Sequence, residues 1–231
     1  MTRRRSARSG EPTWGRLRGR TGGRRQVQGA DKTGISECGR PGRLPAMANS
    51  YARPVLRTAD LDEALRAAGR LLDLADTREL EVDFDARVPD ARALERLLGL
   101  LPGAEWWADG AGHGSSDRGD PPSAHLPVRL MGWGMSADVV RPVLAAAGAC
   151  PVSVRWDFSG WPEAPDIGLG AGGPRGAYVT VCAHARDLDL TEPAADHTVF
   201  VHVKHVEAER APWLAARVGL QVIGELVMAP W

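Results

Sequence analysis

Apolar and polar residues alternate in several short stretches after residue 50, which is the pattern of half-buried β-strands. The clearest stretch is TRELEVDFDA, in which Val82 and Phe84 belong to one face while Glu81, Asp83 and Asp85 belong to the other. Further strands are predicted in the segments RPVLR, AEWWA, LPVRLMGWG, PVSVRWDF, AYVTVCAHA, HTVFVHVKHV and LQVIGELVM.

Apolar residues recur at steps of three and four between Leu61 and Ala75, which predicts an amphipathic helix. Asp60 and Glu63 have the spacing of a capping box at its start. Pro142 should kink a later helix or mark its beginning. The polar, glycine-rich segment from Asp109 to Ala124 is predicted to be an exposed loop. The other helices are predicted from Leu94 to Leu101, from a cap at Ser136 through VRPVLAAAG, and around Glu207 to Val218.

The order of these elements indicates the fold class. Between Leu80 and Phe158 it is strand, helix, strand, strand, helix, strand, which is the βαββαβ order of a ferredoxin-like fold. A further ββαβ segment follows, and we expect it to extend the same sheet. The segment PVLAAAG returns as PWLAARVG, which favours a repeated helix-on-sheet unit. We therefore expect an α+β fold with a mixed or mostly antiparallel sheet and with helices packed mainly on one face.

Charge divides the chain into two parts. Residues 1–46 contain 12 Arg or Lys and 3 Asp or Glu, whereas residues 47–231 contain 17 and 26. The first part is rich in Arg, Gly and Pro without an apolar period, so we expect a disordered tail ahead of one α+β domain over residues 47–231. The tail is either a basic arm for an anionic surface such as nucleic acid, or sequence upstream of a true start at Met47.

Composition also limits the class of protein. No segment approaches the ~20 consecutive apolar residues of a membrane span, so we expect a cytoplasmic protein without membrane contact. The three cysteines are never closely spaced, which does not indicate a disulfide framework or a four-cysteine zinc site. The negative charge of residues 47–231 argues against nucleic-acid binding by this part.

Glycines concentrate between Gly168 and Gly176, directly ahead of the predicted strand AYVTVCAHA. A phosphate-binding loop must open a helix, because the helix N-terminus supplies the N–H groups and the dipole that hold the anion. A strand follows here instead, so we interpret the glycines as a flexible connection or as a flap over a site. The motifs of a P-loop, a nucleophile elbow and a His-Glu-x-x-His zinc helix are absent, and no cofactor is expected.

Cys182, His184 and His202 are the weak candidates for a metal site. Cys182 and His184 share one face of a predicted strand, and an antiparallel neighbour carries His202. A favourable register would bring three ligands together, but histidines that are hydrogen-bonded within the fold are the expected alternative.

The leading functional hypothesis is a non-catalytic binding or regulatory module, of the kind represented by small antitoxin or immunity proteins. An acidic stripe along one strand suits a basic protein partner, and tryptophans are expected to be exposed beside it. The binding residues of this hypothesis are Glu79, Glu81, Asp83, Asp85, Trp156 and Trp161. An ordinary solvated sheet face, with Arg155 or Arg129 opposite the carboxylates, remains the alternative interpretation of the stripe.

Two other functions stay open. The first is a small enzyme with its site under the glycine-rich loop, where His184 or His202 would act as general base and Asp157 or Glu163 as its carboxylate partner. The second is a small-ligand sensor in which two tryptophans, Trp156 and Trp161, stack on an aromatic ligand.

Overall fold

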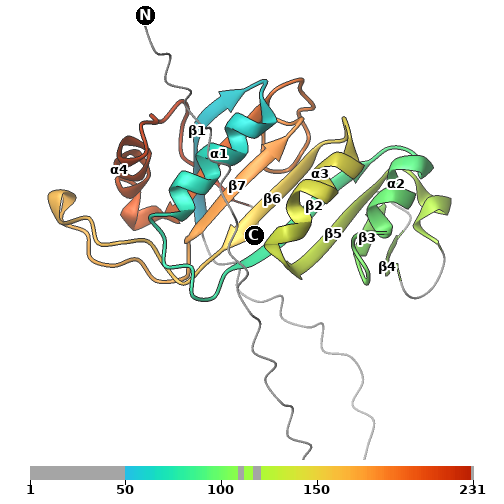
Figure 1. The fold of residues 1–231 in the computed structure, drawn as a ribbon, viewed down its shortest axis with the longest axis horizontal. Coiled ribbons are helices and arrows are strands. Elements are labelled where there is room, and N and C mark those ends of the chain that lie inside the picture. Colours follow the sequence, from blue (N-terminus) through green and yellow to red (C-terminus); the bar gives the residue numbers. More distant parts are fainter. Residues whose placement is uncertain (1–49, 109–111, 117–120, 230–231) are drawn as a thin grey trace, which may run out of the picture. The chain divides into compact units, whose positions relative to one another are not determined.

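A computed structural model describes residues 50–108, 112–116 and 121–229. The expected tail at residues 1–46 and the proposed start at Met47 lie outside these residues. The described part contains four α-helices and one nine-stranded sheet, in which every pair of neighbouring strands is antiparallel (Figure 1). The α+β class is therefore confirmed, and the sheet is antiparallel rather than mixed.

The sheet has the spatial order β4-β3-β5-β2-β6-β7-β8-β1-β9. Its strands are β1 (Ser50–Thr58), β2 (Glu81–Val88), β3 (Glu105–Ala108), β4 (Gly112–Ser115), β5 (Val128–Met135), β6 (Val152–Asp157), β7 (Tyr178–Ala183), β8 (His197–Lys204) and β9 (Val227–Met228). The helices are α1 (Leu61–Leu72), α2 (Ala91–Leu98), α3 (Val140–Ala147) and α4 (Arg210–Arg217). Figure 1 shows α1, α2 and α3 on one face of the sheet, as expected from the sequence.

Eight of the strands form two groups of four with the same internal order. The first group is β2, β3, β5 and β6, and the second is β1, β7, β8 and β9. If the strands of each group are numbered along the chain, their spatial order is 2-3-1-4: β3-β5-β2-β6 in the first group and β7-β8-β1-β9 in the second. Each group also has one helix after its first strand and one before its fourth. The first group is inserted whole between α1 and β7 of the second.

The two points where the chain passes between the groups lie side by side. Asp76 donates its N–H to the carbonyl of Gly160 at 3.0 Å, and Ser159 donates to the carbonyl of Asp76 at 2.9 Å. Glu81 at the start of β2 pairs with Asp157 at the end of β6. The inserted group thus begins and ends at one place, so its insertion leaves the outer group's strands paired.

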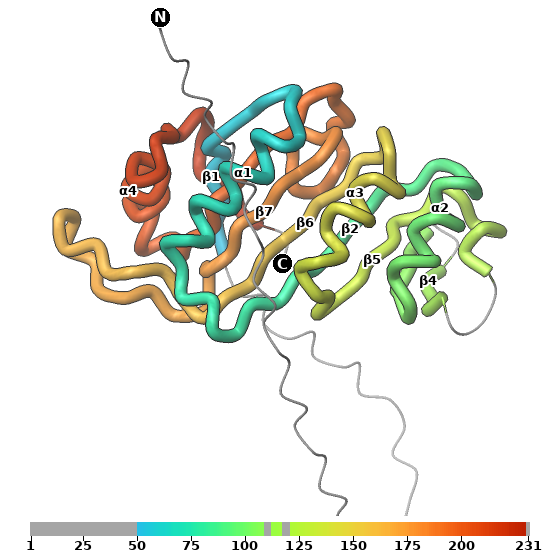
Figure 2. Tube along the Cα trace, in the orientation of Figure 1, coloured from blue at the N-terminus to red at the C-terminus, as the bar shows by residue number. Residues whose placement is uncertain are grey.

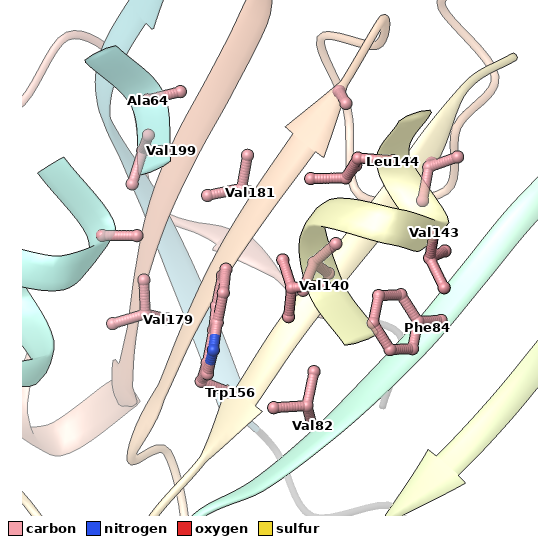
Figure 3. Packing of buried hydrophobic residues seen from close by; sticks show 14 of the residues in the cluster. Ala64, Val82, Phe84, Val140, Val143, Leu144, Trp156, Val179, Val181 and Val199 are labelled. Atoms are coloured by element: carbon pink, nitrogen blue, oxygen red, sulfur yellow. The ribbon is translucent and has the colours of Figure 1, made fainter. Parts of the chain in front are cut away.

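The core lies between the sheet and the helices, and strand alternation explains it. Every second residue of β2, β6 and β7 is apolar and buried against the helices. Figure 3 shows Val140 and Val143 of α3 beside Phe84 of β2 and Trp156 of β6. Across the chain this core unites both groups of strands into one apolar cluster.

The helix starts follow the sequence with small differences. Asp60 caps α1 by accepting hydrogen bonds from the N–H groups of Asp62 and Glu63. Glu63 does not close the capping box; its carboxylate accepts a hydrogen bond from the Thr58 hydroxyl at 2.5 Å. Ser136 makes no side-chain cap, because a 3-10 turn at Ala137–Val139 precedes α3.

Two strands differ from the expectations. The segment expected to be a loop between Asp109 and Ala124 contains β4, which pairs with β3 through Trp106 and Gly114. The strand expected in LQVIGELVM is reduced to the two residues of β9. Pro54 of β1 accepts a hydrogen bond from the N–H of Ile223 but has no N–H to return, so the ladder cannot continue along this edge.

Candidate functional site

The face of the sheet opposite the helices carries most of the polar side chains of the strands. Residues 184–196 cover one part of this face, where Leu188 and Leu190 pack on Phe200 and Cys182. We call the remainder, over β3, β5, β2 and β6, the open face. The acidic residues of β2 belong to this surface.

An acidic cluster lies on the open face, and we define it as Glu81, Asp83 and Asp157 around the guanidinium of Arg155. Arg155 contacts Asp83 at 2.6 Å and Asp157 at 2.8 Å. Glu81 is the exposed member and pairs with Asp157 across the two strands. Two carboxylates therefore share one guanidinium, and Glu81 adds a third carboxylate beside Asp157.

The pKa of Asp157 reflects both its burial and the neighbouring carboxylates. Burial raises its pKa from 3.8 to about 6, the charges of Asp83 and Glu81 add to the rise, and Arg155 opposes it. A carboxyl group that titrates near neutral pH in a cluster of like charge is typical of a functional site, although structural ion-pair networks also produce it.

The acidic stripe expected on β2 is broken up by arginines. Asp85 is almost fully buried and accepts two hydrogen bonds of 2.8 Å from Arg129 on β5. Asp83 is bound by Arg155 and also accepts the N–H of Gly134 at 2.9 Å. Glu79 is exposed but precedes β2. Of the strand's own carboxylates, only that of Glu81 is freely presented to solvent.

The expectation that Trp156 and Trp161 are exposed is wrong. Trp156 is 4% exposed because it shares the inward face of β6 with Val152 and Val154. Trp161 is 3% exposed, and its indole N–H donates to the backbone carbonyls of Gly176 and His202 at 3.1 and 2.8 Å. Both tryptophans are structural.

Two other tryptophans belong to the open face. Trp107 is 36% exposed and Trp133 is 45% exposed, and the indole N–H of Trp133 donates to Glu105 at 3.4 Å. The sequence held a signal for Trp107, because successive strand residues point to opposite faces and its neighbour Trp106 is apolar and inward. Trp133 shares the strand parity of Arg129, so alternation along β5 also places it on this face, next to the register shift between β2 and β5.

The histidines of the enzyme and metal hypotheses do not converge. His202 pairs with Tyr178 at the start of β7, whereas His184 follows the end of that strand, about 20 Å away at the usual strand rise. Cys182 pairs with Thr198, four residues from His202 along β8. Register therefore separates the three proposed ligands, and the described residues hold no group of three side chains suited to a metal ion.

His202 is the polar residue with the most unusual surroundings. Its Nε2 lies 2.9 Å from the hydroxyl of Thr180, and both side chains are fully buried. Burial, and then the charge of Arg155, lower its pKa to about 3, so the ring is neutral. A hydroxyl beside an imidazole can form a nucleophilic pair, but its base needs an orienting group, and Nδ1 has no hydrogen-bond partner among the described residues.

His184 and His197 form a second contact pair, at the end of β7 opposite His202. The rings of His184 and His197 are 4.8 Å apart, and Nδ1 of His197 accepts the N–H of His184 at 3.2 Å. Burial and the neighbouring His184 lower the pKa of His197. These contacts hold the turn after β7, where His184 has a φ of 56°.

The carboxylates of the enzyme hypothesis do not contact the histidines: Asp157 lies in the same cross-strand row as His202, but Tyr178 stands between them. Asp157 is held by Arg155, and Glu163 is exposed in the connection between β6 and β7. The glycine-rich stretch between Gly168 and Gly176 belongs to this connection and is tied to α4 rather than laid over His184. The geometry does not assemble the proposed acid–base pair.

Among the described residues no helix is long and apolar enough to cross a membrane. Comparison with protein-family models, with curated proteins and with solved structures finds no match for the chain.

Proposed function

We propose that this chain is a non-catalytic, cytoplasmic protein-binding module, comparable in role to an antitoxin or immunity protein, and that its open face binds a basic protein. The observation that carries the proposal is the acidic cluster, in which Asp83 and Asp157 share the guanidinium of Arg155 and the exposed Glu81 is paired in register with Asp157. A lysine or arginine of a partner would reduce this excess of negative charge.

The electrostatics of the cluster suit this role. Removing water from an ion pair is favourable only when charges and hydrogen bonds are well matched, and the cluster holds three carboxylates but one guanidinium. A cationic side chain beside Glu81 and Asp157 would lessen this imbalance. Binding would also lower the pKa of Asp157, so we expect proton release on complex formation below about pH 7.

The tryptophans supply apolar contact area next to the charges. Trp107 and Trp133 are both partly exposed on the open face. Buried tryptophan is the residue type most enriched at energetic hot spots of interfaces, and a cation above an indole ring gains a further attraction. We therefore assign Trp133 as an anchor and the acidic cluster as the charge-recognition part of one surface.

We also infer that each group of four strands is a ferredoxin-like unit. In that fold the strands take the antiparallel order 2-3-1-4, with both helices on one face, and both groups have this strand order. The inference explains why one long sheet keeps a broad face without helices, and it makes the repeat of PVLAAAG as PWLAARVG the corresponding helix, α3 and α4, of the two units.

The test is capture of a partner by the immobilised chain from lysate of its own host, followed by purification of the captured protein and measurement of Kd by calorimetry. We expect Glu81→Lys and Trp133→Ala each to weaken binding at least tenfold. The matched control is Glu95→Lys, which makes the same charge change at an exposed position of α2 on the helix side. Equal affinities of Glu81→Lys, Glu95→Lys and the unaltered chain would sink the proposal.

A further inference from the structure

The connection between β6 and β7 is far longer than the sheet requires. The two strands are antiparallel neighbours along their whole length, and such strands are normally joined by two to five residues. Here residues 158–177 intervene, and Figure 2 shows them reaching away from the sheet beyond α4. We call residues 159–177 the projection. Long connections inside a compact fold are uncommon, and they usually carry function or are disordered.

The projection is closed by its own hydrogen bonds, so it is not a loose loop. Ala164 and Leu169 exchange backbone hydrogen bonds of 2.8 and 3.1 Å, and Gly172 donates to the carbonyl of Trp161 at 2.9 Å. Gly160 allows this closure, because a Cβ atom there would lie 2.0 Å from the carbonyl oxygen of Gly172. The two arms of the projection therefore lie against each other up to its tip.

A buried arginine fixes the projection to α4. Arg210 is 1% exposed, and its guanidinium donates to the carbonyl of Pro162 at 2.5 Å and to that of Gly170 at 2.7 Å. Its remaining Nε donates to Glu207 at 2.9 Å. Arg217, at the other end of α4, holds Asp166 at 3.0 Å. Burying a guanidinium is costly unless its hydrogen bonds are satisfied, and here one group from each arm satisfies them.

The tip presents apolar and acidic groups to solvent. Ile167 is 38% exposed in a 3-10 turn, and Glu163, which precedes the turn, is exposed as well. Asp166 is also exposed, but its carboxylate is paired with Arg217. The turn ends at Gly168, whose φ of 72° suits glycine. A rigid tip with one isoleucine and the carboxylate of Glu163 is complementary to a recess with an apolar floor and a basic rim.

The base of the projection connects it to the acidic cluster. It begins two residues after Asp157, and its returning arm leads into Tyr178; Asp157 and Tyr178 pair with each other. A protein bound over Asp157 is therefore adjacent to the root of the projection.

We infer that the projection is a preorganised docking element that inserts into a basic-rimmed, apolar recess of the protein bound by the open face, and that Arg210 is its positioning residue. This inference rests on the proposed function, because it takes the same partner. Holding the element in one conformation before binding lowers the entropy cost of association. The buried Arg210 supplies that order at a distance from the contact itself.

The experiment measures affinity and local order in the full chain. With the purified partner, Ile167→Asp should weaken binding at least tenfold, while Val206→Asp, which alters an 85% exposed residue outside the projection, should stay within twofold. In the unbound protein, Arg210→Lys should speed hydrogen exchange at the amides of Ala164, Leu169 and Gly172 at least tenfold without changing β7 and β8.

The outcomes separate the two proposals. If Glu81→Lys weakens binding and Ile167→Asp does not, the docking role is overturned and the open-face proposal stands. If Ile167→Asp weakens binding and Glu81→Lys does not, the projection docks but the open face does not. Unchanged exchange in Arg210→Lys overturns the positioning role of Arg210. If the chain retains no partner from its host, both proposals are overturned.

Discussion

Asp157 and His202 flank Tyr178 in one cross-strand row of the sheet, and their pKa values are shifted in opposite directions. Asp157 pairs with Tyr178, and Tyr178 pairs with His202. Burial raises the pKa of the carboxyl group to about 6 and lowers that of the imidazole to about 3. Both shifts favour the neutral form, so both residues resist charge in the folded protein. The two groups nevertheless make the free energy of unfolding depend on pH with opposite signs.

Asp157→Asn should remove a loss of stability that sets in as the pH rises. The folded protein holds the Asp157 proton up to about pH 6, whereas the unfolded chain releases it near pH 4. The folded state thus binds more protons in this window, and the free energy of unfolding falls as pH rises through it, by about 2–3 kcal/mol in total. Denaturant unfolding of both proteins at about pH 4, 5 and 6.5 measures the difference. Parallel pH profiles would contradict the assignment.

His202→Gln should remove a pH dependence of the other sign. The unfolded chain protonates His202 near pH 6.5, while the folded protein does so only near pH 3. The unfolded state therefore binds more protons between these values, and the free energy of unfolding falls on acidification, by an amount on the order of a few kcal/mol. Titration of the ring by NMR is the direct check; an imidazole that titrates near pH 6.5 in the folded protein would refute the prediction.

Arg129→Met should destabilise the fold strongly because it leaves a buried carboxylate without its cation. Asp85 is 2% exposed, and burial already raises its pKa against the pull of Arg129. Breaking such a pair costs about 3–5 kcal/mol. Arg66→Met is the control, because it removes an ion pair with Asp60 that is more than half exposed and should cost less than about 1 kcal/mol. Comparable losses in thermal unfolding for the two variants would count against the buried pair.

Strand alternation was sufficient to predict the central strands, because a strand with one buried face has apolar residues at every second position. Val82 and Phe84 point into the core and Glu81 and Asp83 point out, as the pattern indicates. The edge strands show a weaker alternation of apolar and polar residues. β4 has the sequence GHGS, without alternation, and it exists as a strand because β3 offers a free edge. The shortening of β9 depends on Pro54, which is distant in sequence.

The candidate site was only partly predictable, because register and long-range ion pairs decide it. The sequence identified Glu81 and Asp83 in the stripe and suggested Arg155 or Arg129 opposite it, but it could not show which carboxylates each arginine holds or that Asp157 joins them. It placed His184 and His202 on neighbouring strands, yet only the register shows that they sit at opposite ends of β7. Trp156 was predictable as buried from its own strand, since it shares the parity of Val154.

Gly160→Ala tests whether the projection is closed as described. The added Cβ would lie 2.0 Å from the carbonyl oxygen of Gly172, the residue whose N–H donates to Trp161 and closes the two arms. Such a contact with backbone forces the arms apart, and overpacking typically costs about 1–3 kcal/mol.

Gly170→Ala is the matched control for this change. A Cβ there meets open space, although Gly170 belongs to the same projection and accepts a hydrogen bond from Arg210. We expect its stability to change by less than about 0.5 kcal/mol or to rise slightly, because alanine restricts the unfolded chain more than glycine does. Chemical denaturation of both variants gives the comparison. If Gly160→Ala were as stable as Gly170→Ala, the two arms would not lie in contact, and the rigidity on which docking by Ile167 depends would be lost.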